Sequence, residues 1–305
     1  MNKYEKMIQE LIDSYNIDET TYKEKAEELY NQANVTCHKY NDQINTINSL
    51  RHGLQDEISD LYKFLVRFGN VDKKITPFHY VTEDSKYVDR KPESPSLKNS
   101  RYNNTETSGF MKTTAIAMAA FVPVALPALL IGNFWRKRAQ SKEMYLLYVE
   151  EYEKVKIAWE KSLEIRQTEI QFYKVATEIA DKYRALVSTV RNAIRETILP
   201  ELSGVDAFLV ADAIKNSIIS GMDPREAEVS SIDTYRGTAY DMHYVFVRNA
   251  FDYYTMLVNF FTEPILTKIV EDNEITPDER EMFENERSAI EQQTKLLENT
   301  AIFGG

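Results

Sequence analysis

Residues 112–138 read KTTAIAMAAFVPVALPALLIGNFWRKR and form the least polar stretch of the chain. The 23 residues from 113 to 135 carry no charge, although 28% of the whole chain is charged. A helix of that length extends about 34 Å at ~1.5 Å per residue, enough to cross a ~30 Å hydrocarbon layer. The stretch therefore predicts a membrane-inserting segment, and residues 115–131 within it have no polar side chain at all.

Two sets of residues in this segment are predicted to meet a bilayer. Its prolines prevent one unbroken straight helix, so a kinked span and a re-entrant hairpin both fit. The alternative without a membrane is a buried core helix. The basic and aromatic flank is typical of a membrane interface on the cytoplasmic side. The inserting set is Ala115, Ile116, Met118, Phe121, Val122, Pro123, Leu126, Pro127, Leu129, Leu130 and Ile131, and the interface set is Lys112, Trp135, Arg136, Lys137 and Arg138.

Helical patterns lie on both sides of the apolar segment. Residues 2–16 predict a short amphipathic helix, and residues 18–69 predict one long helix, with Asp18 or Thr20 as its cap. Residues 70–109 are polar and contain three prolines, which predicts a loop with a short hairpin near 78–87. A second long helix is expected from about residue 137 to Pro200, where the proline ends it.

The seam of this second helix contains a polar stretch. Tyrosine, valine and alanine residues recur at heptad spacing on both sides of Ser162, Arg166 and Glu169. Two explanations stay open: the polar residues form a wet joint or a register device, or Leu163, Ile165 and Ile170 take over the buried face as the helix rotates.

The whole pattern predicts an all-α fold, namely an elongated antiparallel hairpin of long helices, or coiled-coil bundle, with the apolar segment at its tip. A C-terminal helical bundle follows, with residues 238–261 as its central helix and Thr276 as the cap of its last helix. The expected parts are an N-terminal helix and rod (1–69), a polar loop (70–109), the membrane-inserting segment (110–137), a second rod (138–199) and the C-terminal bundle (200–305).

Composition excludes several classes of function. The net charge is −11, from 37 basic and 48 acidic residues, so the chain as a whole does not favour nucleic acid. The nine glycines form neither a phosphate-binding loop nor a dinucleotide-binding fingerprint, and the four histidines have no zinc or di-iron spacing. We expect no catalytic residues, no metal and no cofactor, and therefore no enzyme.

Two long rods around an apolar tip resemble the layout of α-helical pore-forming toxins of the cytolysin A kind. The resemblance covers roughly residues 18–199 and rests on layout without a diagnostic motif. It implies a membrane-inserting protein that oligomerises, with a lipid bilayer and further copies or a helical protein as partners. The charged N-terminus contains no signal peptide, so we expect membrane association from a soluble cytoplasmic or leaderless-exported form. A coiled-coil scaffold or tether in the membrane, and a soluble bundle with the apolar run as its core, are the alternatives.

Overall fold

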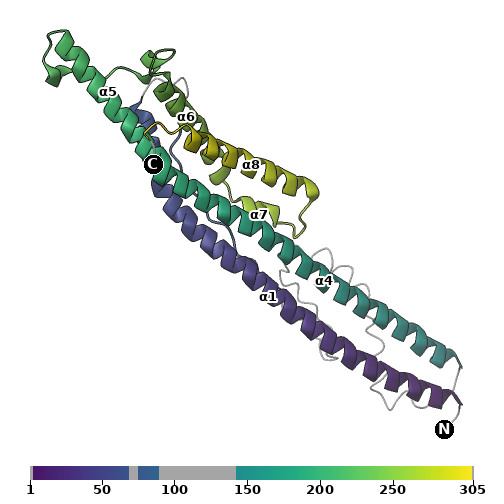
Figure 1. Cartoon of the computed structure of the whole chain (residues 1–305). Coiled ribbons are helices and arrows are strands. Elements are labelled where there is room, and N and C mark those ends of the chain that lie inside the picture. Colours follow the sequence, from purple (N-terminus) through teal and green to yellow (C-terminus); the bar gives the residue numbers. More distant parts are fainter. Residues whose placement is uncertain (1–2, 69–74, 89–141, 304–305) are drawn as a thin grey trace. The chain divides into compact units, whose positions relative to one another are not determined.

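The computed structural model describes residues 3–68, 75–88 and 142–303 (Figure 1). All regular elements in these ranges are helices, which confirms the predicted all-α class. The chain divides into two compact units. The N-terminal unit contains residues 1–40, 86–177 and 271–274, and the C-terminal unit contains residues 41–85, 178–270 and 275–305. The boundaries predicted from the sequence are of a different kind, because both long helices contribute to both units.

The first helix, α1, is Lys3–Arg67 and is continuous. The predicted break near Asp18 and Thr20 is wrong, since the Thr20 hydroxyl donates to the carbonyl of Asn16 one turn earlier instead of capping a new helix. From Ala33 onward the buried residues alternate between steps of four and three, which is the heptad pattern of a helix packed along its length. They are Ala33, Cys37, Tyr40, Ile44, Ile47, Arg51, Leu54, Ile58, Leu61, Leu65 and Phe68.

The second long helical stretch contains three consecutive elements. They are α4 (Lys142–Ala193), the π-helical turn η1 (Ile194–Ile198) and α5 (Leu199–Ile219). The prediction that Pro200 ends the helix is wrong. Proline lacks an N–H and its ring clashes with the carbonyl four residues earlier, and a widened π turn just before Pro200 accommodates both defects. α5 ends at Ile219, and Gly221 just beyond it adopts a positive φ of 72°, which suits a helix terminus.

Contacts within the N-terminal unit show the relative direction of α1 and α4. Tyr15 packs against Tyr152 with 5.7 Å between ring centroids, and further along both helices Tyr40 packs against Tyr173 at 6.3 Å. Residue numbers therefore rise together on the two helices, which run parallel in this unit (Figure 1).

The C-terminal unit shows the same direction. Arg191 of α4 pairs with Glu57 of α1 at 3.0 Å, and Asp206 of α5 pairs with Arg67 at 2.6 Å. The class of two long packed helices is confirmed, but these contacts contradict the antiparallel direction predicted for them. A heptad pattern reads the same in either direction, and the hairpin was inferred from the order of the segments alone.

Shorter helices complete the C-terminal unit. The Thr276 capping box predicted for the last helix is confirmed, and α6 supplies most of the aromatic core, including Phe246, Tyr253 and Phe261. The additional elements are η2 (Pro224–Glu226), η3 (Ile232–Tyr235), α6 (Asp241–Phe261), α7 (Ile265–Ile269) and α8 (Pro277–Asn299).

Candidate functional site

Residues 75–85, which we call the strap, cross the C-terminal unit without forming a helix or a strand, so the hairpin predicted near 78–87 is wrong. Tyr80 lies against His52 of α1, with 5.8 Å between ring centroids. Glu83 lies one turn earlier on the same helix, at Asn48. The strap therefore runs antiparallel to α1, and hydrogen bonds to side chains replace those of a β-ladder.

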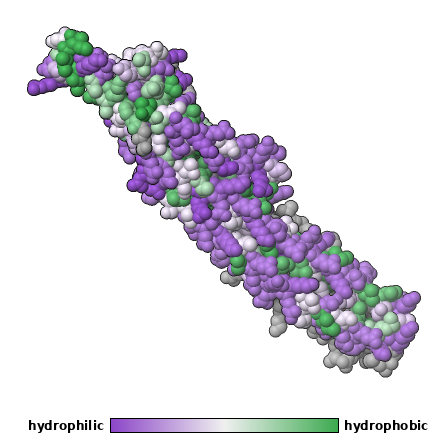
Figure 2. All heavy atoms as spheres, in the orientation of Figure 1, coloured by the Kyte–Doolittle hydropathy of each residue, from purple (hydrophilic) through white to green (hydrophobic). Residues whose placement is uncertain are grey.

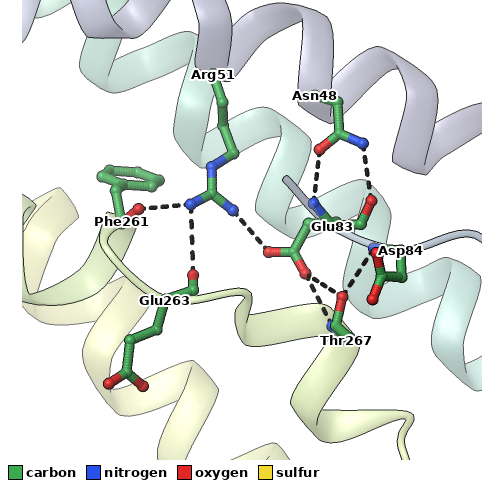
Figure 3. A network of polar contacts seen from close by, with 7 residues as sticks. All are labelled: Asn48, Arg51, Glu83, Asp84, Phe261, Glu263 and Thr267. Atoms are coloured by element: carbon green, nitrogen blue, oxygen red, sulfur yellow. Dashed lines mark hydrogen bonds and ion pairs between the residues drawn. The ribbon is translucent and has the colours of Figure 1, made fainter. Parts of the chain in front are cut away.

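Glu83 joins the strap to α1 and α7 through both its backbone and its side chain (Figure 3). Asn48 donates from Nδ2 to the Glu83 carbonyl at 2.9 Å and accepts the Glu83 N–H at 2.8 Å. The carboxylate Oε1 lies 2.7 Å from Nη1 of Arg51, and Oε2 accepts from the N–H and the hydroxyl of Thr267 at 2.8 and 3.0 Å. The Thr267 hydroxyl also accepts the N–H of Asp84 at 2.8 Å. We call these five residues the clasp.

Arg51 connects the clasp to the end of α6. Its Nη2 donates to the carbonyls of Phe261 and Glu263, at 2.5 and 3.4 Å (Figure 3). The guanidinium carbon lies 5.9 Å from the centre of the Tyr183 ring. Among the described residues, however, Nε of Arg51 and the hydroxyl of Tyr183 are buried without a hydrogen-bond partner. The network thus satisfies most of its polar atoms but not all of them.

The two charges of the clasp are removed from water, with Arg51 0% and Glu83 3% exposed. Burial raises the pKa of Glu83, and this outweighs the opposite effects of Thr267 and Arg51. A raised pKa means that the ionised carboxylate is held at a cost in free energy. Desolvation of a buried pair can exceed its Coulomb attraction, whereas removing one partner alone costs about 3–5 kcal/mol. The clasp therefore specifies where the strap docks more than it stabilises the unit.

Arg51 was not among the residues predicted from the sequence, although the sequence contains a signal for it. The buried seam of α1 passes through Ile47, Arg51 and Leu54 at steps of four and three. Hydrophobic reasoning favours the neighbouring Leu50, which is half-buried in the structure. A charged residue at a seam position predicts a buried partner, but the position of Glu83 in a non-periodic loop cannot be read from the pattern.

The polar stretch of α4 contacts α1 directly in the N-terminal unit. The Tyr22 hydroxyl donates to Oγ of Ser162 at 3.2 Å. Arg166 lies over the ring of Tyr30, 5.5 Å from its centre, and forms an ion pair with Glu169. The polar side chains themselves therefore meet α1, while Ile170 beside them is buried at 4% exposed, so features of both explanations are present.

The residues predicted to meet a bilayer lie outside the described residues. This holds for the inserting set within 115–131 and for the interface residues 112 and 135–138. In the described part of the chain, no helix combines the length and the apolar character needed to cross a membrane.

An apolar stripe is exposed on α5. Val210, Ile214 and Ile218 recur every four residues and are 40%, 39% and 60% exposed, and Ile219 and Met222 follow at 72% and 59%. Figure 2 shows hydrophobic atoms gathered at the C-terminal end of α5, next to a mostly hydrophilic surface. A stripe with i, i+4 spacing is normally the face by which a helix packs against a neighbour.

Within residues 3–68, 75–88 and 142–303, no three side chains of the metal-binding types lie close enough together to hold a metal ion. Comparisons of the chain with protein families, with curated proteins and with solved structures gave no match.

Proposed function

We propose that this chain is a non-enzymatic, membrane-associated helical protein that inserts residues 113–135 into a bilayer. The observation that carries the proposal is the length of this uncharged run in a chain that is 28% charged. In this proposal the protein starts from a cytoplasmic or leaderless-exported water-soluble form, and several copies assemble at the membrane. Pore formation is the finer version of the same proposal.

The flanks of the run support this function. Trp135 and the three basic residues that follow it have the chemistry of an interface with anionic lipid headgroups. Upstream, the strap is fastened to the C-terminal unit through Glu83. Downstream, α4 begins at Lys142, four residues after Arg138. Folded elements therefore precede and follow the segment in sequence. The parallel direction of α1 and α4 removes the hairpin tip on which the toxin-like layout rested, so the proposal rests on the segment itself.

Flotation with liposomes and release of a trapped dye test the proposal. The double variant Ala119→Asp/Ala125→Asp places two charges in the run, each costing about 2.5–3.5 kcal/mol at the centre of a bilayer. We expect it to lose flotation and leakage while its helicity, measured by circular dichroism, stays unchanged.

The matched control is Thr105→Asp/Ser108→Asp, which adds the same charges to the polar sequence before the run. This control should float like the unaltered protein. Unchanged flotation of the Ala119→Asp/Ala125→Asp variant would exclude insertion of this segment. A loss of folding in that variant would instead identify the run as protein core, because unpaired charges would then be buried.

The stripe on α5 favours a second candidate function, a scaffold or tether assembled from copies of this chain. In an antiparallel two-fold pairing of two α5 helices, Ile214 faces its own copy and Val210 faces Ile218. Since these three residues are uncharged, the pairing places no like charges at its centre. Sedimentation of the unaltered protein should then show a dimer that Ile214→Asp converts to a monomer, and a monomer in both cases would contradict this function.

A further inference from the structure

We propose that the clasp is releasable: the strap opens locally from the C-terminal unit, and this opening controls how readily residues 113–135 reach a bilayer. The first part concerns the described structure alone. The second part rests on the proposed function, because it gives that function a point of control.

The strap has few attachments other than the clasp. Phe78 and Glu83 are the strap residues with buried side chains. The remaining contacts include the hydroxyl of the buried Tyr254, which donates to the carbonyl of Thr76 at 2.5 Å, and an exposed 3.3 Å contact between the Tyr80 hydroxyl and His52. A segment with few buried apolar contacts opens at a lower free energy than the helices around it.

The chemistry of the clasp also favours local opening. When the strap lifts, Glu83 and Arg51 regain water, and their hydration offsets part of the free energy of the lost ion pair. An apolar contact would gain no such compensation from water. The unpartnered Nε of Arg51 gains a hydrogen bond at the same time. A partly satisfied buried network is therefore a suitable fastening for a segment that must detach and return to the same place.

Opening changes how far the following chain can reach. The strap precedes residues 89–141, which contain the apolar run. An undocked strap of 11 residues extends by up to about 3.3–3.6 Å per residue, or roughly 36–40 Å. The docked strap withholds part of that length, because Glu83 is tied to α1 and α7. The chain just beyond the strap is also held, since the Lys86 carbonyl accepts from Sγ of Cys37 at 3.3 Å, and this contact must break as well for the full reach.

Hydrogen exchange without membranes tests the local opening. Thr267→Val keeps the shape of the side chain but removes the hydroxyl that donates to Glu83 and accepts from Asp84. We expect the strap amides, those of Glu83 and Asp84 in particular, to exchange about tenfold faster. Asn48→Ala should act in the same direction, and circular dichroism verifies that each variant is folded.

Thr255→Val is the matched control. It makes the same chemical change on α6, where the Thr255 hydroxyl donates to the carbonyl of Phe251 within the same helix. This variant should leave exchange in the strap unchanged. If Thr267→Val accelerated exchange in α6 and α8 as much as in the strap, the unit would be opening globally and the clasp would be refuted.

The membrane part is tested with vesicles of phosphatidylcholine and phosphatidylglycerol. We expect Thr267→Val to release trapped dye several-fold faster than both the unaltered protein and Thr255→Val. Faster strap exchange with an unchanged rate of release would refute the control of insertion while the proposed function stands. A failure of the unaltered protein to bind these vesicles would refute the proposed function and its control, and local strap exchange would still establish the clasp.

Discussion

His243 of α6 is a buried imidazole enclosed by aromatic rings. Phe208 lies 4.3 Å and Phe303 5.7 Å from it, measured between ring centroids, and its Nδ1 has no hydrogen-bond partner among the described residues. Burial lowers the pKa of His243 from 6.5, and the nearby Glu201 carboxylate opposes this effect only in part. The folded protein therefore holds His243 neutral at pH values where the unfolded chain protonates it.

The sign of the resulting pH dependence follows from linkage. The contribution of His243 to stability is complete above its unfolded pKa of about 6.5, and it is lost as the pH falls toward the lowered pKa. We expect the unfolding free energy, measured with urea, to decrease below pH ~6.5. His243→Phe should remove up to about 1.4 kcal/mol per pH unit of that slope.

The exposed His79 supplies the control for this prediction. His79→Phe makes the same chemical change at the surface of the strap, and its slope is the reference with which that of His243→Phe is compared. Equal slopes in the unaltered protein and in His243→Phe would show that another group is responsible for the acid sensitivity.

Among the elements, periodicity located the helices better than it located their ends. Apolar residues at steps of three and four identified α1, α4 and α6, because burial of one face dictates that spacing. The capping signal at Thr276 identified α8. The errors came from Thr20, taken as the cap that starts a helix, and from Pro200, taken as the residue that ends one. Thr20 bonds back to its own helix, and a π turn accommodates Pro200, so tertiary packing overrode both local signals.

The polar contact between α1 and α4 leads to a prediction at the scale of elements. Arg166 and Glu169 form an ion pair with side chains 12% and 11% exposed. Replacing either one alone by Leu should lower the unfolding free energy by about 3 kcal/mol, because the other charge then stays at the interface without its ion-pair partner. The double variant Arg166→Leu/Glu169→Leu should recover most of that loss.

Urea unfolding of the four proteins in this cycle provides the measurement. Losses that simply add in the double variant would mean that the two residues act independently, which would contradict the pairing. The exposed pair Lys63 and Asp60 on α1 serves as the comparison, since its removal should cost at most about 1 kcal/mol.

At the scale of the whole molecule, the sequence pattern did not show the direction of α4 relative to α1. The two long helices were foreseen from their seams, but a seam fits a parallel or an antiparallel neighbour equally well. The clasp was hidden for a related reason. Arg51 stands in a periodic helix and shows itself as a charge in the seam, whereas Glu83 stands in a segment without periodicity and is placed only by the folded C-terminal unit.

Cysteine cross-linking tests the parallel direction. In a Cys37→Ser background, Asp18→Cys and Lys156→Cys replace an exposed ion pair of 3.0 Å between α1 and α4 in the N-terminal unit. A short bifunctional maleimide should join these two cysteines within one chain.

Asp18→Cys with Ser188→Cys is the opposing pair, which a hairpin closing between residues 69 and 137 would bring together. Because Ser188 lies 32 residues beyond Lys156 on α4, about 48 Å along the helix, this pair should not react. Cross-linking of the second pair and not the first, at a protein concentration low enough to exclude joined copies, would show that the helices run antiparallel.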